Sequence, residues 1–408
     1  MKNVASSVTT PTPRRWLTAT LLILCCCSTG LVHAGAREQA KRIHDRLAGV
    51  PATDAVITSM AAKITGGDVA GAANEAMDNR AFYDVTLKNF VTPWTNRDAN
   101  VFAPLNDYTA TVIGMVRDNK DFRTVLYEDI LYVSNASGVP GYSNSNNAHY
   151  EALENQNINL KDTLIERAQS SVTGMPSAAT AGVITTRAAG RAFFIDGTNR
   201  AMFRWTLMNH LCNDLEQVAD TTYVPDRIRQ DVTRSPGGDS RVFLNSCIGC
   251  HSGMDPLAGA YAYYDYEYPE NDMEGGQVVY RPAGYMNESH GTRVDEKYFN
   301  NDGNFKPGYV TTDETWANYW RKGKNSLLGW DNALPGSGSG AKSMGQELAH
   351  SEAFAQCQVK KVFRTVCLRN AVDSNDRNQL DVMVNNFKSS GYRLKQVFAD
   401  SANYCKGD

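Results

Sequence analysis

The chain has 408 residues, of which 42% are hydrophobic, 10% aromatic and 21% charged. This length is enough for one large or two medium hydrophobic cores, and the composition excludes a disordered chain. The formal net charge is −3. A mildly acidic chain gives no reason to expect a nucleic-acid partner, so none is predicted.

Residues 1–36 have the layout of a secretory signal peptide. Arg14 and Arg15 form a positive start, the apolar run over 16–27 is too short to span a membrane, and Ala34 belongs to a small-residue cleavage site. We therefore predict export to the periplasm or the extracellular space, with cleavage of this leader. Lipid attachment at the leader's cysteines is the alternative; membrane association is not predicted, because the residue before them is not small.

Hydrophobic spacing predicts a mainly helical chain after the leader. The first part contains predicted helical stretches and then a polar loop, at 35–77, 79–95, 106–130 and 134–148. The middle part predicts helices at 160–169, 181–196 and 198–218, and a strand at 264–268 where tyrosines alternate with acidic residues. The last part predicts a short helix at 315–320 and longer helices at 344–368, 376–389 and 392–403.

The stretch Cys247-Ile248-Gly249-Cys250-His251 is a Cys-x-x-Cys-His motif, the attachment site of a c-type haem. Two thiols add to the two vinyl groups of one porphyrin, and the imidazole that follows binds iron from the proximal side. A thioredoxin-like pair does not need the histidine, and a structural zinc site needs two more closely spaced ligands. The motif therefore predicts one covalent haem c on Cys247 and Cys250, with His251 as the proximal ligand.

Four further cysteines follow the leader, an even number in an oxidising compartment: Cys212, Cys357, Cys367 and Cys405. Cys357 and Cys367 lie in one predicted helix, about 15 Å apart along its axis, whereas a disulfide needs Cα atoms within about 7 Å. Cys212 should therefore pair with one of them and Cys405 with the other. The preferred pairing is Cys212–Cys357 with Cys367–Cys405, and four buried free thiols are the alternative.

The sixth iron ligand must approach from the face opposite His251, so it should be distant in sequence. Met344 is the first choice, because it follows a Gly/Ser-rich loop and precedes the final helices, as the distal methionine does in small cytochromes c. Packing of Met344 in the core is the alternative. Met286 is the second choice and His290 the third. Met254 lies too close after His251 to reach the other face and is interpreted as packing.

Other residues near the motif are candidates to support the haem. Arg234 and Arg241, with Arg229, are predicted to pair with the propionates, because guanidinium matches carboxylate in a two-pronged contact. Ordinary solvated arginines are the alternative. Asp255-Pro256 predicts the end of the histidine-bearing helix, with its carbonyls or the proline orienting the imidazole.

Three stretches resemble the C-terminal modules of the planctomycete-type cytochrome c family, whose members contain several domains of unknown function. They are 182–187 with 197–201, the haem motif continued through 252–258, and 351–357 with 390–395. The second is similar to the family pattern Cys-x-x-Cys-His-x-x-x-Asp-Pro-Leu-Gly. Ala258 replaces its glycine, and the region 270–340 is expanded. The resemblance covers about residues 180–408 and implies export and haem, but no particular activity.

Together these features predict a mostly α protein. A multi-helical, cytochrome c-like haem domain with long irregular loops would occupy 181–408, after an N-terminal helical region at 37–180. The predicted function is that of an exported monohaem c-type cytochrome, which transfers one electron with a redox partner protein. The alternatives are a peroxidase- or oxidase-like haem enzyme with an open distal site, or a subunit of a larger redox or surface assembly. No catalytic residue is predicted.

The acidic, tyrosine-rich stretch at 265–274 is a second candidate for binding. Its carboxylates predict either a docking surface for a basic redox partner or a calcium site, because calcium prefers oxygen ligands. A solvated acidic edge is the simplest alternative.

Overall fold

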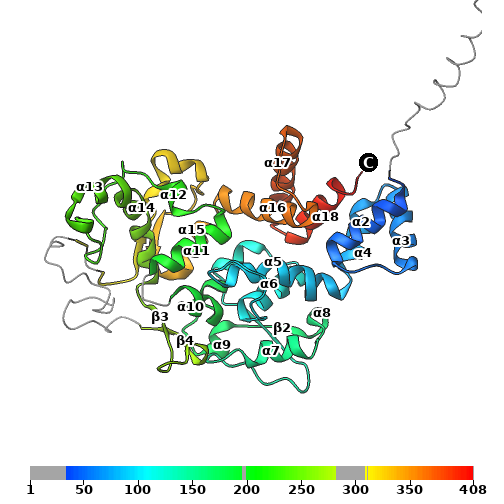
Figure 1. The fold of residues 1–408 in the computed structure, drawn as a ribbon, viewed down its shortest axis with the longest axis horizontal. Helices are drawn as coiled ribbons and strands as arrows, with labels where there is room; N and C mark the ends of the chain where they lie inside the picture. The colour runs from blue at the N-terminus through cyan, green and yellow to red at the C-terminus, as the bar shows by residue number, and fades with distance from the viewer. Residues whose placement is uncertain (1–33, 195–198, 282–307, 310, 408) are drawn as a thin grey trace, which may run out of the picture.

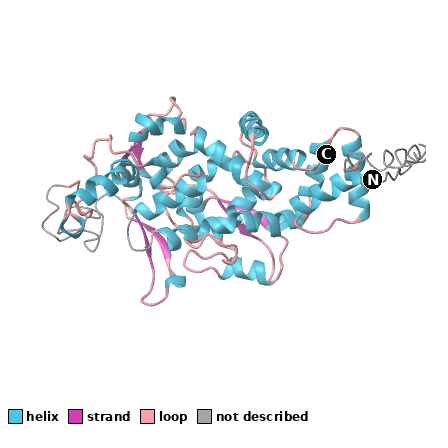
Figure 2. Ribbon diagram, turned by 45° about the horizontal axis from the view of Figure 1, so that its top comes forward, coloured by secondary structure: helices cyan, strands magenta, loops and turns pink. Residues whose placement is uncertain are grey.

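The computed structural model describes residues 34–194, 199–281, 308–309 and 311–407. This part of the chain is mainly helical with a few short strands, which confirms the predicted mostly α class (Figure 2). The predicted leader, apart from its last residues, lies outside the described residues, and so do Met286 and His290. No helix in the described ranges combines the length and the apolar character needed to cross a bilayer.

The first elements form a helical bundle: α2 (Ala36–Ala48), α3 (Asp54–Thr65), α4 (Val69–Met77), a π-helical turn (Phe82–Leu87), α5 (Lys88–Val91) and α6 (Asp107–Arg117). Local chemistry sets their ends. The side chains of Thr53 and Asp68 accept hydrogen bonds from the first backbone N–H groups of α3 and α4. Gly49 ends α2 in the left-handed conformation, at φ 72°.

The next elements are β1 (Leu131–Ser134), α7 (Ala148–Asn155), α8 (Leu160–Thr163), β2 (Leu164–Arg167), α9 (Gln169–Thr173), α10 (Arg187–Phe193), α11 (Asn199–Leu211) and α12 (Leu215–Val218). The predicted helix at 160–169 is therefore wrong beyond its first turn. Strand β2 pairs antiparallel with β1, with Ile165 opposite Val133. Pairing with a strand far back in the chain overrides the local helical spacing.

The segment that contains the haem motif comprises α13 (Ser240–Val242), a π-helical turn (Phe243–Cys247), α14 (Ile248–Ala258) and the hairpin of β3 (Tyr264–Glu267) with β4 (Gln277–Tyr280). Strand β3 confirms the strand that was predicted from the alternating tyrosines. The predicted helix at 315–320 is wrong, because β5 (Thr315–Ala317) pairs with β6 (Ser337–Ser339) before a short 3-10 turn. Both partners are short, so only their pairing defines the strand.

The last elements are α15 (Gly340–Ala349), α16 (Glu352–Cys367), α17 (Ser374–Ser389) and α18 (Leu394–Tyr404). The single helix predicted at 344–368 is two helices, since the hydroxyl of Ser351 accepts a hydrogen bond from the Phe354 amide and starts α16 afresh. Helix α18 packs against α4 and α2, so the first and last helices of the described residues lie side by side (Figure 1).

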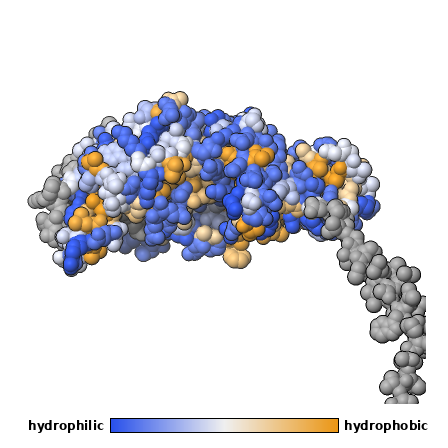
Figure 3. Space-filling view, turned by 90° about the horizontal axis from the view of Figure 1, so that it is seen from above, coloured by the Kyte–Doolittle hydropathy of each residue, from blue (hydrophilic) through white to orange (hydrophobic). Residues whose placement is uncertain are grey.

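One hydrophobic cluster includes residues from Ala40 to Ala402, and the division predicted near residue 180 stays a prediction. A small second cluster consists of Ile228, Val232 and Phe243, beside the haem motif. The surface seen in Figure 3 is mostly hydrophilic, with separate apolar patches. The chain that leads into the haem motif therefore packs in a small core of its own, whereas α14 packs into the main cluster through Met254 and Leu257.

The predicted disulfides are confirmed. Cys212 is bonded to Cys357, with Cα atoms 5.2 Å apart, and Cys367 to Cys405, with Cα atoms 5.5 Å apart. The first joins the end of α11 to α16 and the second joins α16 to the end of α18. Cys247 and Cys250 are free thiols.

Candidate haem site

The haem motif begins at Cys247, the last residue of the π-helical turn, and continues into the start of α14. Such turns inside helices are frequent at functional sites. Residues three and four apart share a helix face, so Cys247, Cys250 and His251 face one side. All three side chains are partly exposed. The motif thus presents two thiols and an imidazole together on an accessible surface of the helix.

The opposite face of α14 is fixed by close packing. A Cβ on Gly253 would lie 2.0 Å from Nε1 of Trp320, so only glycine fits there. The Gly249 carbonyl accepts a hydrogen bond of 2.9 Å from the Asp220 amide. Gly253 is two residues from His251, about 200° around the helix, and Trp320 therefore packs on the face away from the imidazole. Trp320 is a core residue that anchors the helix.

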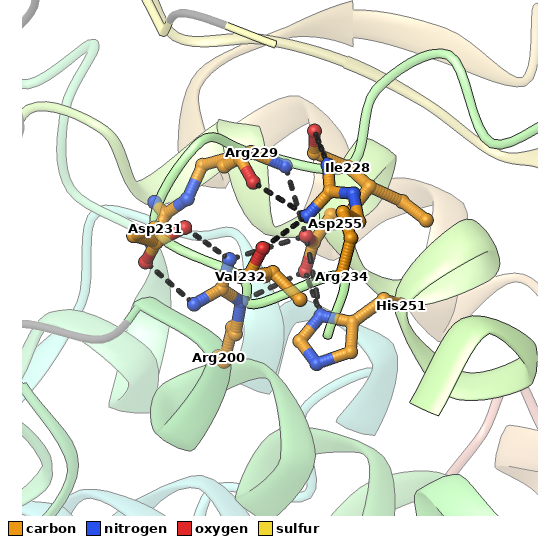
Figure 4. A network of polar contacts seen from close by, with 8 residues as sticks. All are labelled: Arg200, Ile228, Arg229, Asp231, Val232, Arg234, His251 and Asp255. Atoms are coloured by element: carbon orange, nitrogen blue, oxygen red, sulfur yellow. Dashed lines mark hydrogen bonds and ion pairs between the residues drawn. The ribbon is translucent and has the colours of Figure 1, made fainter. Parts of the chain in front are cut away.

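The imidazole of His251 is held by a buried carboxylate (Figure 4). Its Nδ1 lies 3.1 Å from Oδ1 and 3.3 Å from Oδ2 of Asp255, one helical turn later. The Asp255 side chain is 0% exposed, whereas that of His251 is 21% exposed. In Figure 4 the other ring nitrogen, Nε2, points away from the contacts drawn. The imidazole therefore offers Nε2 as a ligand atom with its orientation already fixed.

Two arginines and a second aspartate surround Asp255. Arg200, near the start of α11, contacts Asp255 through Nε at 2.8 Å and makes two bonds of 2.7 Å to Asp231. The backbone N–H of Arg229 donates to Asp255 Oδ2 at 3.3 Å, and its side chain contacts Asp231 at 3.1 Å. The network joins α11, α14 and the loop between them, so it fixes the loop against the motif.

The network keeps both carboxylates charged. Burial alone would raise the pKa of Asp255, but Arg200 and the hydrogen bond from His251 hold that pKa well below its ordinary value. Burial also opposes ionisation of Asp231, and the charges of Arg229 and Arg200 lower its pKa. Asp255 is therefore ionised at neutral pH, where it contacts Nδ1 of the imidazole.

The predicted helix end at Asp255-Pro256 is wrong. Helix α14 continues through Pro256 to Ala258, and the group that orients His251 is the Asp255 side chain. The spacing of four residues between histidine and aspartate was the signal that sequence reasoning missed. Arg200 and Asp231 were missed as well, and no local pattern marks them, because they reach Asp255 from distant segments.

The predicted propionate partners lie in different surroundings. Arg234 donates to the carbonyls of Ile228 at 2.9 Å and Arg229 at 3.2 Å, and its guanidinium lies 5.2 Å from the ring centre of Phe243. Arg241 is exposed and makes a two-pronged contact with Asp239. Arg234 thus packs within the segment that bears the motif, whereas Arg241 lies at its surface.

Met344 is completely buried on α15, which packs against the 3-10 turns at Phe122–Leu126 and Gly259–Tyr261. This is the packing role that the sequence left as the alternative; its role as distal ligand stays a prediction. Met254 is also buried in the main cluster, consistent with its interpretation as packing.

The acidic stretch forms the β3–β4 hairpin and the turn between its strands. Asp265 and Glu267 make ion pairs with Arg281, and Glu274 pairs with Arg191. Across the described ranges, no three His, Cys, Asp or Glu side chains gather into a possible metal site. Arginines therefore neutralise much of this edge, and calcium binding or partner docking there stays a prediction.

The residues present fit a c-type haem. Cys247 and Cys250 remain thiols while the other cysteines in the described ranges pair, and His251 has Nδ1 engaged while Nε2 points away from that contact (Figure 4). No protein-family model matches the chain, and neither does any curated protein or solved structure. The resemblance over residues 180–408 and the cytochrome c-like fold consequently stay predictions.

Proposed function

We propose that this chain is an exported c-type cytochrome with one covalent haem, and that its task is one-electron transfer. The observation that carries the proposal is that two free, partly exposed thiols share a helix with an imidazole whose Nδ1 is held by a buried carboxylate, so that Nε2 is the atom left to bind a metal. A bound haem would supply an iron that changes oxidation state by one electron. Cys247 and Cys250 would anchor it, and His251 would bind from the proximal side.

The test is to produce the chain in cells that mature c-type cytochromes and to measure the denatured protein. We expect a mass increase of one haem per chain and a pyridine haemochrome spectrum typical of thioether-bound haem. A Cys247→Ala/Cys250→Ala variant made in the same cells is the control and should carry none. Wild-type protein that folds without covalent haem would contradict the proposal.

A haem enzyme with an open distal site is the second candidate, and one observation favours it. The acceptor at His251 Nδ1 is a charged carboxylate rather than a backbone carbonyl, which makes the imidazole a stronger donor. The spectrum separates the two candidates. A six-coordinate, low-spin form in both oxidation states supports the carrier, and a high-spin ferrous form that binds carbon monoxide supports the enzyme.

A further inference from the structure

We propose that Asp255 is a positioning residue for His251, and that Arg200 and Asp231 hold it so that the proximal imidazole is a strong electron donor. The inference rests on the proposed function and deepens it, because it predicts a haem of lowered reduction potential. No part of it follows from the Cys-x-x-Cys-His pattern, which specifies the histidine but not the partner of its second nitrogen.

The first step is the direct contact. His251 and Asp255 lie one turn apart on α14, with Nδ1 at 3.1 Å from Oδ1. An imidazole that donates its Nδ1 proton to a carboxylate must present the Nε2 lone pair to a metal. A negatively charged acceptor pulls on that proton and raises the basicity of Nε2. Asp255 therefore fixes both the tautomer and the donor strength of His251.

The second step is the rigidity of the carboxylate. Arg200 contacts both oxygens of Asp255, through Nε at 2.8 Å and a terminal nitrogen at 3.2 Å. Arg200 is itself held by both oxygens of Asp231 at 2.7 Å. The side chains of Asp255 and Asp231 are 0% and 5% exposed. The carboxylate is therefore kept in one orientation and shielded from water, where a charge acts more strongly than at the surface.

The third step is the consequence for the iron. A stronger nitrogen donor and a nearby buried anion both favour the oxidation state with the higher positive charge. The Arg200 charge offsets part of the field of Asp255, but it leaves the hydrogen bond to Nδ1 in place. The His251–Asp255 pair should consequently stabilise the ferric state and lower the reduction potential.

The test compares reduction potentials of purified holoproteins by spectroelectrochemistry. In Asp255→Asn the acceptor keeps its size but loses its charge, and we expect the equilibrium to move at least tenfold toward the reduced form, or about 59 mV for a one-electron couple. Asp239→Asn is the matched control, because that exposed carboxylate contacts Arg241 instead. Asp231→Asn loosens the support of Arg200 and should move the potential in the same direction, but less.

The outcomes distinguish this inference from the proposed function. Haem-loaded Asp255→Asn protein with the potential of the Asp239→Asn control would overturn the inference and leave the cytochrome intact. If Asp255→Asn takes up no haem, Asp231→Asn decides, and an unchanged potential there overturns the inference. Wild-type protein without covalent haem would overturn the proposed function and the inference together.

Discussion

Two regions of the molecule are held together by different forces. The segment that leads into the haem motif, residues 224–247, has a small apolar cluster of its own and contributes Arg229 and Asp231 to the buried charge network around Asp255. The helical body, formed by α11, α16 and α18, lies in the main hydrophobic cluster and carries both disulfides. Apolar burial and two disulfide bonds stabilise the helical body. The segment relies on paired charges and, by the proposed function, on its ligand.

The largest expected effect separates the two regions at once. In Cys247→Ala/Cys250→Ala, covalent haem should be lost completely, and backbone amides over 223–239 should exchange faster, because the cluster around Phe243 is small. The helical body should keep its protection. Hydrogen exchange with mass spectrometry measures both. A Cys367→Ala/Cys405→Ala variant should show the reverse, with haem retained, and uniform loss of protection in either variant would break the comparison.

Removal of a disulfide should destabilise the body. The Cys212–Cys357 bond closes a span of 145 residues and the Cys367–Cys405 bond one of 38. Loop-entropy arguments predict losses of about 5 and about 4 kcal/mol for the respective double alanine variants. Urea unfolding followed by circular dichroism measures them. A larger loss for the shorter span would show that packing of the sulfurs outweighs loop entropy.

Arg200 tests the charge network that supports the segment. Arg200→Ala removes the guanidinium that pairs with both buried carboxylates, Asp255 and Asp231, which should cost about 3–5 kcal/mol. Arg204→Ala is the matched control one turn along α11, because its pair with Asp214 is largely exposed and is worth about 0.2–1 kcal/mol. Equal losses in chemical unfolding would contradict a special role for the network.

The smallest effect concerns pH and the body. Burial holds the pKa of His210 well below its ordinary value of 6.5. Below about pH 6.5 this imidazole binds a proton in the unfolded chain but not in the folded chain. The free energy of unfolding therefore falls as pH falls, by up to about 2 kcal/mol at pH 5. In His210→Gln, which can still contact the Tyr108 hydroxyl, this part of the slope should disappear. His350→Gln, at a half-buried site, is the control for unfolding measured between pH 7 and 5.

Local patterns predicted the parts of the molecule that local physics determines. Helical spacing indicated most helices, and the distance along one helix excluded a Cys357–Cys367 bond and left two pairings open, of which the structure contains the preferred one. The elements that were wrong depend on distant partners. Strands β2 and β5 exist because β1 and β6 pair with them, and no window around residues 160–169 or 315–320 contains that information.

The same limit applies to the candidate site. The Cys-x-x-Cys-His motif is local, and so is the spacing from His251 to Asp255, which was available but was interpreted as a helix end. The contacts of Arg200 and Asp231 arise only when α11 and the loop before α13 meet α14.

The chain contains two free thiols as well as two disulfides, which has a consequence for how its cysteines pair during folding. Six cysteines follow the predicted leader, and six cysteines can form three bonds in fifteen ways. Capture of Cys247 and Cys250 by haem leaves only three ways to pair the other four. The Cys250 sulfur lies 3.5 Å from the carbonyl of Leu215. By the proposed function, haem attachment before oxidation would therefore remove twelve of the fifteen possible cysteine pairings.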